Sequence, residues 1–454
     1  MIPLTYKEAA AAAGSETALE GRFDSVSTDS RKIEKNSLFI ALSGDRFDGH
    51  EFAASALEKG AGAVVVHKDC GLGDRQILVD NTGEALLAIA GYYRSLFNIP
   101  VVGITGSVGK TTTKEMTYTV INSKYNTLKN EGNLNNEIGV PLTLFRLEKS
   151  HEAAVIEMGM NHFGEISRIT KAVRPDAAII SNIGVSHIEN LGSREGILKA
   201  KLEILDGMKE DAPLILNGDD DMLCKAETGS HPVIRYGITN SSCAYKALNI
   251  TSTDDETDFA VGFDGGPLGV CLPFRGRHNI YNALAAIAAG GCLGISVADA
   301  AGALKEYRTT GMRQKIVKRN GISFIEDCYN ASPDSQKAAL EVLGSMNQGR
   351  KIAVLGDMLE LGSYSETAHS LVGEYAADNG VDILYTYGES SAATANRAKE
   401  KGVKDVRHFT DKIDLALDLA NELRSGDSVL FKASRMMKFE EIIYKVFDVL
   451  GLED

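Results

Sequence analysis

Short apolar runs alternate with amphipathic segments along the middle of the chain. Apolar runs at 101–105, 153–157, 177–183 and 213–217 are separated by stretches whose apolar residues recur every three or four positions. Buried strands of a parallel sheet form nearly continuous apolar runs, and helices that cover a sheet have the longer period. The pattern therefore predicts a parallel sheet covered by helices in the central part of the chain.

The same alternation occurs on both sides of this central part. Strand-like runs at 37–42 and 61–67 flank a helical stretch at 51–60, and five more runs lie at 322–327, 351–357, 382–388, 406–410 and 428–434. The 454 residues exceed what one hydrophobic core usually serves. We therefore predict an α/β fold with three domains: a small N-terminal α/β domain at 1–98, a central P-loop domain at 99–311 and a C-terminal Rossmann-like domain at 312–454.

Composition narrows the class of protein. The net charge of -14 disfavours a nucleic-acid-binding surface, so a bound anion has to be held locally by loop amides and a few cations. The six cysteines form no CxxC pair, which indicates reduced thiols. The N-terminus lacks the basic region of a signal peptide, and the Ala- and Gly-rich run at 282–300 is typical of a packed helix and turn. We expect a cytoplasmic enzyme that binds neither nucleic acid nor membrane.

The stretch VVGITGSVGKTTTKEM at 101–116 has the pattern of a phosphate-binding loop. A buried strand leads into a glycine-rich turn and a helix opens at Lys110, so that loop amides and the helix N-terminus converge on one anion. Lys110 is expected to reach the β- and γ-phosphates, and the Thr111 hydroxyl to ligate Mg²⁺. The general pattern has a glycine where this chain has Ile104. The alternative is an ordinary glycine turn, in which Lys-Thr-Thr would have no packing role.

Polar residues gather where several predicted strands end. Glu157 ends the run at 153–157, and His187 follows the next run. In open α/β sheets ligands bind at this edge, and a carboxylate there suits Mg²⁺. The alternatives at these two positions are a solvated glutamate and a surface histidine.

The segment at 127–141 contains four asparagines, whose amides suit a polar ligand: Asn130, Asn133, Asn135 and Asn136. The alternative for this segment is a turn-rich surface loop.

Lys201 occupies an unusual position on the helical stretch at 194–208. It lies in line with Ile197, Ile204 and Met208, on an apolar stripe where a lysine normally has no place. Such a lysine must extend to solvent, pair with an anion or be chemically changed. The sequence leaves these three possibilities open.

Two further positions lie nearer the predicted third domain. Asn279 stands with His278 and Asn282 at a helix start, where capping alone could explain it. Arg313 lies at the predicted junction between the second and third domains, from which a cation could reach the phosphates. A plain surface arginine is the alternative.

With these features in this order, the chain resembles the Mur ligase family over essentially its whole length. TDSRKI and ALSGDRFDGHEFAASALEKGA near the start, and DCYNASPDS, VLGDMLELG and KASRMMKFEEI near the end, resemble the branch that adds D-alanyl-D-alanine to a UDP-muramoyl tripeptide. The Asp-Asn-Pro-Arg motif of the branch that adds diaminopimelate does not occur. The resemblance implies that ATP phosphorylates the tripeptide carboxylate and that the dipeptide amine then displaces the phosphate.

The resemblance also implies a set of site residues. The catalytic residues would be Lys110, Lys201, His187 and Arg313. ATP would be held by Gly106, Ser107, Val108, Gly109, Lys110, Thr111, Thr112, Asn279, Arg313 and Asp327. Two Mg²⁺ ions would be held by Thr111, Glu157, His187 and Lys201, the last as a carbamylated lysine. The substrates would contact Ser30, Arg31, Asp48, Gly49, His50, Asn135, Asn136, Asp357 and Ser434, with Leu359, His369 and Arg435 as further candidates in the last domain.

One departure from the family and two alternative functions remain. The last motif usually reads Lys-Gly-Ser, whereas this chain has Lys432, Ala433 and Ser434, which predicts a different loop path there.

The folylpolyglutamate synthase-like branch shares the central domain but lacks a nucleotide-sugar domain before the loop. A P-loop kinase or regulatory NTPase would use the outer domains to bind a protein partner. We expect a monomer, and the third residue of the accepted peptide, lysine or diaminopimelate, stays open.

Overall fold

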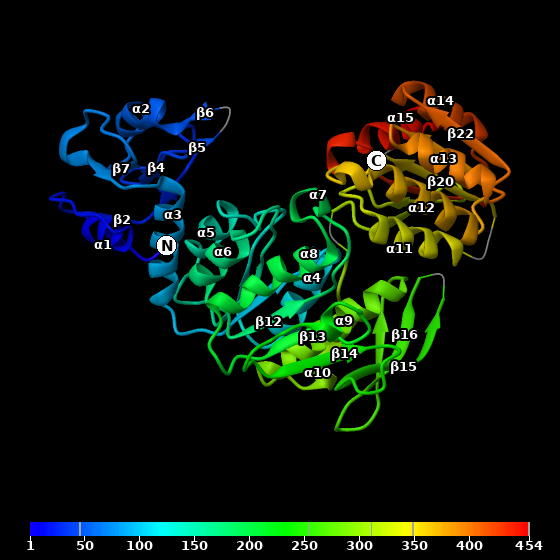
Figure 1. The fold of residues 1–454 in the computed structure, drawn as a ribbon, viewed down its shortest axis with the longest axis horizontal. Coiled ribbons are helices and arrows are strands. Elements are labelled where there is room, and N and C mark those ends of the chain that lie inside the picture. The colour runs from blue at the N-terminus through cyan, green and yellow to red at the C-terminus, as the bar shows by residue number, and fades with distance from the viewer. Residues whose placement is uncertain (45–46, 254, 310, 347–348, 453–454) are drawn as a thin grey trace.

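The computed structural model describes residues 1–454 except 45–46, 254, 310, 347–348 and 453–454. It is an α/β fold in which three main sheets occupy successive parts of the chain. Figure 1 shows the first part, in blue, and the last part, in yellow to red, on opposite sides of the central part, in green. The predicted boundaries near 98 and 311 fall between elements of different sheets.

The first part is built on a four-stranded parallel sheet in the order β3-β4-β7-β8. Its helix α1 begins at a capping box in which the Thr5 side chain accepts from the Glu8 amide. Two antiparallel pairs, β1–β2 and β5–β6, flank the sheet. The elements are β1 (Leu4–Thr5), α1 (Tyr6–Ala12), β2 (Arg22–Phe23), β3 (Val26–Ser27), β4 (Leu38–Ile40), β5 (Ser43–Gly44), β6 (Phe47–Asp48), η1 (Gly49–Phe52), α2 (Ala53–Glu58), β7 (Ala63–Val66), η2 (Gly73–Arg75), β8 (Gln76–Leu78) and α3 (Thr82–Ser95).

The central part is a nine-stranded sheet in the order β10-β11-β9-β12-β13-β14-β15-β16-β17. Its strands are parallel from β10 to β15, and β16 and β17 extend it in antiparallel fashion. The elements are β9 (Val101–Thr105), α4 (Lys110–Asn122), β10 (Thr127–Lys129), α5 (Gly139–Leu144), β11 (Ala153–Glu157), α6 (Glu165–Val173), β12 (Ala177–Ile180), α7 (Ile188–Leu191), α8 (Arg194–Leu202), η3 (Glu203–Gly207), β13 (Leu214–Asn217), η4 (Leu223–Lys225), β14 (Val233–Gly237), β15 (Tyr245–Ser252), β16 (Thr257–Gly262), β17 (Leu268–Leu272), α9 (Arg277–Cys292) and α10 (Val297–Lys305).

The predicted central strands match β9, β11, β12 and β13, all of which consist mainly of buried apolar residues. The antiparallel extension does not follow from the apolar runs, because β15 is mostly half-buried or exposed, β16 alternates buried with more exposed positions, and both contain polar residues. The Ala-rich run forms most of α9, which packs against α4 and is buried along almost its whole length. Within the described part of the chain, no helix is long and apolar enough to cross a membrane.

The last part is a six-stranded sheet in the order β18-β19-β23-β20-β21-β22, parallel except for the β18–β19 pair. All five predicted runs correspond to strands, and only the more exposed β18 lacks a predicted counterpart. The elements are β18 (Lys315–Arg319), β19 (Ile322–Glu326), α11 (Pro333–Gly344), β20 (Lys351–Gly356), η5 (Gly362–Tyr364), α12 (Ser365–Asp378), β21 (Ile383–Tyr387), α13 (Ser391–Glu400), β22 (Asp405–Phe409), α14 (Lys412–Glu422), β23 (Ser428–Lys432), η6 (Arg435–Met437) and α15 (Glu440–Leu450).

Helix α3 joins the first part firmly to the central part. One hydrophobic cluster runs from the first sheet through α3 to α5, α6 and the central sheet. Gly91 of α3 allows a close approach, because a Cβ there would lie 3.2 Å from the Cα of Ala172 on α6. Arg94 is buried at the same junction and donates to the carbonyl oxygens of Val173, Phe97 and Ile99. The first part is therefore anchored through a packed helix as well as through the connecting chain.

Candidate active site

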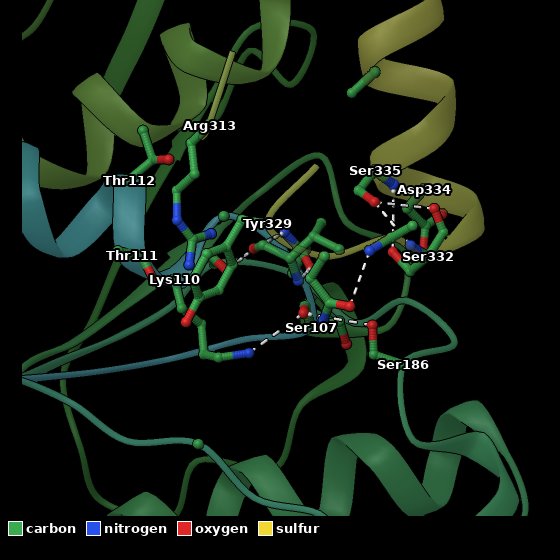
Figure 2. Close-up of a pocket in the computed structure, with 18 of the residues that line it drawn as sticks. Ser107, Lys110, Thr111, Thr112, Ser186, Arg313, Tyr329, Ser332, Asp334 and Ser335 are labelled. Carbon is green, nitrogen blue, oxygen red and sulfur yellow. Dashed lines mark hydrogen bonds between the residues drawn. The ribbon is translucent and has the colours of Figure 1, made fainter. Parts of the chain in front are cut away.

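A cavity of about 570 Å³ lies between the central and last parts of the chain. The loops that follow β9, β11 and β12 line one side of it, as expected for the carboxyl edge of a parallel sheet. The other side is lined by the loop after β19 and the start of α11 (Figure 2) and by the loops after β20 and β23. No described residue of the first part lines this cavity.

The phosphate-loop sequence forms a strand, a tight turn and a helix. Gly106 has φ 154° and a Cβ there would lie 2.0 Å from the Ser181 hydroxyl oxygen, so only glycine fits. Gly109, with φ 79°, directly precedes α4. Ile104, which departs from the general pattern, is a fully buried residue of β9 paired with Ile179 on β12. Because Ile104 lies in the strand and not in the turn, the absence of a glycine at this position does not disturb the turn.

Two lysines converge on the loop. Lys110 Nζ donates to the carbonyl oxygen of Gly106 at 2.9 Å, and Lys201 Nζ donates to the same oxygen at 2.9 Å. Lys201 is 1% exposed, so the interpretation that it extends to solvent is wrong. Burial and then the Lys110 charge lower the pKa of Lys201 well below its ordinary value. Burial also lowers the pKa of Lys110, and Glu157 opposes that shift.

The Glu157 carboxylate lies among polar side chains from three segments. Its Oε2 accepts from the Thr111 hydroxyl at 2.9 Å, and its Oε1 accepts from the Asn135 amide at 2.7 Å. Asn130 holds the Glu157 backbone through both its amide and its carbonyl, at 2.9 Å each. The residue is 1% exposed. A hydroxyl and a carboxylate next to a phosphate loop form the oxygen donor set that Mg²⁺ prefers, so these residues fit the ion.

His187 faces the last part of the chain. Its φ is 62°, and its Nδ1 lies 2.8 Å from a carboxylate oxygen of Glu360 in the loop after β20. This contact with His187 lowers the pKa of Glu360. Both residues line the cavity. The structure thus places His187 at the contact between the two parts.

The three remaining residues expected at the nucleotide also line the cavity. The Asn279 amide donates to the Arg275 carbonyl at 2.7 Å and to the Gln314 side chain at 2.9 Å. The Arg313 guanidinium stacks over the Tyr329 ring at 3.9 Å, as Figure 2 shows. Asp327 pairs with Lys432 at 2.6 Å. All three therefore occupy the junction between the two parts, within the same cavity as the loop.

The segment after β12 supports the loop in a way that our sequence analysis missed. The Asn182 side chain accepts from the Val108 amide at 3.0 Å and donates to the Val108 carbonyl at 2.9 Å. The Gly184 amide donates to the Ser107 hydroxyl at 2.9 Å. Asn182 follows a strand at the edge where Glu157 stands, so the same edge rule could have identified it. Tyr329 and Lys432 lie in motifs that the sequence resemblance includes, but their partners are known only from the fold.

The candidates of the first part form a separate group. Asp48 accepts from the Ser43 hydroxyl at 2.9 Å and from His50 Nδ1 at 2.6 Å, and Lys68 pairs with it at 2.6 Å. Hydrogen bonds, first from Lys68, hold the pKa of Asp48 well below its ordinary range. Gly49 cannot carry a side chain, because a Cβ would lie 2.4 Å from the Leu42 carbonyl oxygen.

Two other candidates of the first part lie at its surface. The Arg31 guanidinium is exposed and pairs with Asp29, while the Ser30 carbonyl oxygen accepts from Lys59 at 2.9 Å. Like Asp48, Gly49 and His50, they are not among the residues that line the cavity.

Several substrate candidates have structural partners in this conformation. The Asp357 carboxylate accepts from the Ser391 amide at 2.7 Å at the start of α13, and the Asn136 side chain accepts from the Gly139 amide at 2.8 Å at the start of α5. His369 is fully buried, with Nε2 accepting from the Met358 amide and Nδ1 donating to the Ser365 carbonyl. The structure does not bring Asp357 or His369 to the cavity, whose lining residues include Asn135, Asn136, Leu359, Ser434 and Arg435.

The fold and the site define a class of nucleotide-dependent ligase. Residues 104–290 match the Mur ligase middle domain, and residues 312–435 match the Mur ligase glutamate ligase domain. Residues 22–93 match a region described as Mur ligase family, catalytic domain. The chain belongs to the Mur ligase family.

Two curated relatives carry the name of one enzyme type. The UDP-N-acetylmuramoyl-tripeptide–D-alanyl-D-alanine ligase of Bacillus subtilis (strain 168) is 43% identical over 92% of both chains. The ligase of the same name from Escherichia coli (strain K12) is 38% identical over 92% of this chain and 93% of its own. The crystal structure I of MurF from Acinetobacter baumannii superposes with a TM-score of 0.92 at 32% identity, covering 98% of this chain and 99% of that one.

Proposed function

We propose that this chain is an ATP-dependent ligase that joins D-alanyl-D-alanine to UDP-N-acetylmuramoyl-tripeptide and forms the UDP-muramoyl pentapeptide. The observation that carries the proposal is one cavity in which a phosphate loop, the Thr111–Glu157 pair and the junction residue Arg313 meet between the central and last parts of the chain. The similarity to ligases of that name runs over more than nine tenths of the chain. A MurF structure from Thermotoga maritima, 29% identical with a TM-score of 0.86 and covering 94% of this chain and 98% of that one, is described as a complex with ADP.

The reaction starts at a carboxylate, which is a poor electrophile until one of its oxygens becomes part of a leaving group. Transfer of the γ-phosphoryl group of ATP to the terminal carboxylate of the tripeptide gives an acyl phosphate and ADP. The dipeptide amine attacks the acyl carbon, phosphate leaves, and the amine proton passes to solvent or a nearby base. Lys110, at the start of α4, and Arg313, across the cavity, would offset charge on the transferring group.

Thr111 and Glu157 would hold a first Mg²⁺, and the ion would supply charge neutralisation at the phosphates. Gly106, Ser107, Val108, Gly109 and Thr112 would hold ATP from the loop, and Asn279 and Asp327 from the other side of the cavity. Asn135 and Asn136 would contact the muramoyl peptide near Glu157, and Ser434 would contact the dipeptide. Ser30, Arg31, Asp48, Gly49 and His50 would hold the uridine diphosphate end.

Lys201 would act as a carbamate that ligates a second Mg²⁺ together with His187. The burial and the neighbouring charge that lower its pKa favour the neutral amine, which is the form that reacts with carbon dioxide. The neutral amine nitrogen forms a bond to the carbon of CO₂ and releases one proton, so that an uncharged amine becomes an anion. The resulting negative charge would lie close to the Lys110 ammonium, because the two side chains share one acceptor.

The deciding measurement is ADP formation with a panel of UDP-muramoyl peptides and D-amino acid dipeptides. A ligase releases ADP and phosphate only when both the tripeptide and the dipeptide are present. Tripeptides ending in lysine and in diaminopimelate test the third residue. A regulatory P-loop NTPase would instead hydrolyse ATP without either substrate, and that result would exclude the proposal.

A single sedimentation boundary at the mass of one chain is expected for a cytoplasmic monomer.

A further inference from the structure

Behind the Glu157 carboxylate lies a fully buried lysine that the mechanism above does not use. Lys114, on α4, is 0% exposed and stands one helical turn after Thr111, on the same face of the helix. Its Nζ donates to the Asn130 carbonyl oxygen at 2.8 Å and lies 3.8 Å from Oε2 of Glu157. A lysine without solvent contact needs anionic partners, and Glu157 is one of them.

A second carboxylate completes the group. Lys114 Nζ lies 3.1 Å from Oε1 of Glu115, and the other oxygen of Glu115 pairs with Lys129 on β10. Lys129 also lies over the Tyr118 ring, 4.2 Å from its centre. We call Lys114, Glu115, Lys129 and Glu157 the buried charge group, although the Lys129 side chain at its edge is 25% exposed. It contains two cations and two anions, so its formal charge is already zero before any metal ion binds, and the Lys110 ammonium, which interacts with Glu157, lies outside this count.

The net charge of the buried charge group affects whether Mg²⁺ binds as a free ion or together with the nucleotide. A free Mg²⁺ that binds at Glu157 would add two positive charges to a neutral, poorly solvated group only a few ångströms from Lys114, and this is electrostatically unfavourable. The same ion bound to a nucleotide triphosphate carries its own counter-charge. The arrangement therefore disfavours the free ion far more than the ion bound to nucleotide.

From this geometry we propose that Lys114 is a positioning residue that keeps Glu157 neutralised and aimed, so that the metal ion enters the site together with the nucleotide. The proposal deepens the proposed function, on which it rests for the identity of the nucleotide. It assigns to Lys114 a role in the order of binding, distinct from the contact of Lys110 with the phosphates.

Because the role depends on net charge, charge substitutions give effects of opposite sign. Lys114→Met leaves the buried charge group at -1, and the affinity of the nucleotide-free full-length protein for Mn²⁺ is expected to rise about tenfold or more. Glu115→Gln leaves it at +1, and that affinity is expected to fall by a similar factor. The double variant returns the charge to zero and is expected to restore the wild-type affinity. Lys114→Arg keeps the charge and is expected to bind Mn²⁺ as the wild type does.

The measurement is a titration with Mn²⁺ alone, followed by electron paramagnetic resonance, repeated with a non-hydrolysable ATP analogue present. With the analogue the spread among the variants is expected to shrink to about threefold, because the phosphates neutralise the ion. Lys199→Met, on the exposed side of α8, is the matched control and is expected to leave both affinities unchanged. Circular dichroism establishes that each variant is folded.

The outcomes separate this proposal from a structural role. A lysine that only supports the fold would weaken metal binding when it is removed, in the single and the double variant alike. Unchanged or weaker Mn²⁺ binding by Lys114→Met overturns the proposal, and if that variant does not fold, unchanged or tighter binding by Glu115→Gln does so. None of these titrations requires turnover, so a failure of the ligase function itself would appear separately, as wild-type protein that forms no ADP with its substrates.

Discussion

The amines of Lys110 and Lys201 share a single acceptor, the carbonyl oxygen of Gly106, and each lies 2.9 Å from it. One lysine comes from the helix that follows the loop and the other from α8, 91 positions later in the sequence. Two ammonium groups on one oxygen repel each other, and this repulsion adds to burial in lowering the pKa of Lys201. The structure therefore brings two amines together where a triphosphate and its metal ions would bind, and disfavours the charged form of the more deeply buried one.

Removing the Lys201 side chain tests its proposed carbamate. Lys201→Ala is expected to lower the rate of ADP formation about 100-fold, because the second metal site loses its anionic ligand. Short carboxylic acids such as formate or acetate are expected to restore part of the rate by occupying the vacated space. Lys199→Ala, two residues away and exposed, is the control and is expected to retain the wild-type rate. Absence of rescue in a folded Lys201→Ala protein would contradict the carbamate.

Glu157→Gln tests the first metal site. The amide keeps the size of the side chain but removes its charge, so the Mg²⁺ concentration at half-maximal ADP formation is expected to rise about tenfold or more. The Thr111 hydroxyl can still donate to the remaining oxygen, which limits the effect on folding. Glu195→Gln, on the exposed face of α8, is expected to leave the Mg²⁺ requirement unchanged. An unaltered requirement in Glu157→Gln would exclude Glu157 as a ligand.

Arg94→Met tests the junction between the first and central parts. Arg94 is 7% exposed and donates to three backbone carbonyl oxygens, which methionine cannot satisfy. Each buried acceptor left without a donor costs about 1–3 kcal/mol, so the urea midpoint of unfolding is expected to fall clearly. Circular dichroism monitors the transition, because the chain contains no tryptophan. Arg308→Met, at an exposed position, is the comparison, and equal midpoints for the two variants would disprove the role of Arg94.

His369 predicts how the stability of the last part depends on pH. Burial lowers the pKa of His369, and its Nε2 accepts the Met358 amide, which requires the neutral ring. Below about pH 6.5 His369 binds a proton in the unfolded chain but stays neutral in the folded chain until the pH reaches its lowered pKa. Stability is therefore expected to be retained above that pH and lost as the pH falls from it towards the lowered pKa of the folded state.

The comparison of two pH values isolates this histidine. The drop in the urea midpoint between about pH 7.5 and about pH 5.5 is expected to be smaller in His369→Gln than in the wild type. His162→Gln, at an exposed position, is expected to show the full wild-type drop. The same drop in both variants would mean that His369 does not contribute.

Much of the fold could be predicted from the pattern of residues. Apolar runs such as 101–105 and 153–157 became β9 and β11, because a parallel strand covered on both faces is apolar along its length. The half-exposed strands β15 to β17 were not predicted in this way, because polar positions interrupt their apolar residues. Helix α3 lies in the predicted first domain, yet its packing on α6 through Gly91 depends on a surface that no local pattern reveals.

The sequence by itself determined the family, the phosphate loop and the choice of Lys201 as an anomalous residue. Each of these depends only on residue types within short stretches of the chain. Only the tertiary structure decided which groups meet. It brought the Lys201 amine onto the Gly106 carbonyl, enclosed Lys114 between Glu115 and Glu157, and set His187 against Glu360. It also committed Asp357 and His369 to backbone partners outside the cavity. Such contacts join segments distant in the chain, and their free energies depend on burial and on charges that sequence spacing does not specify.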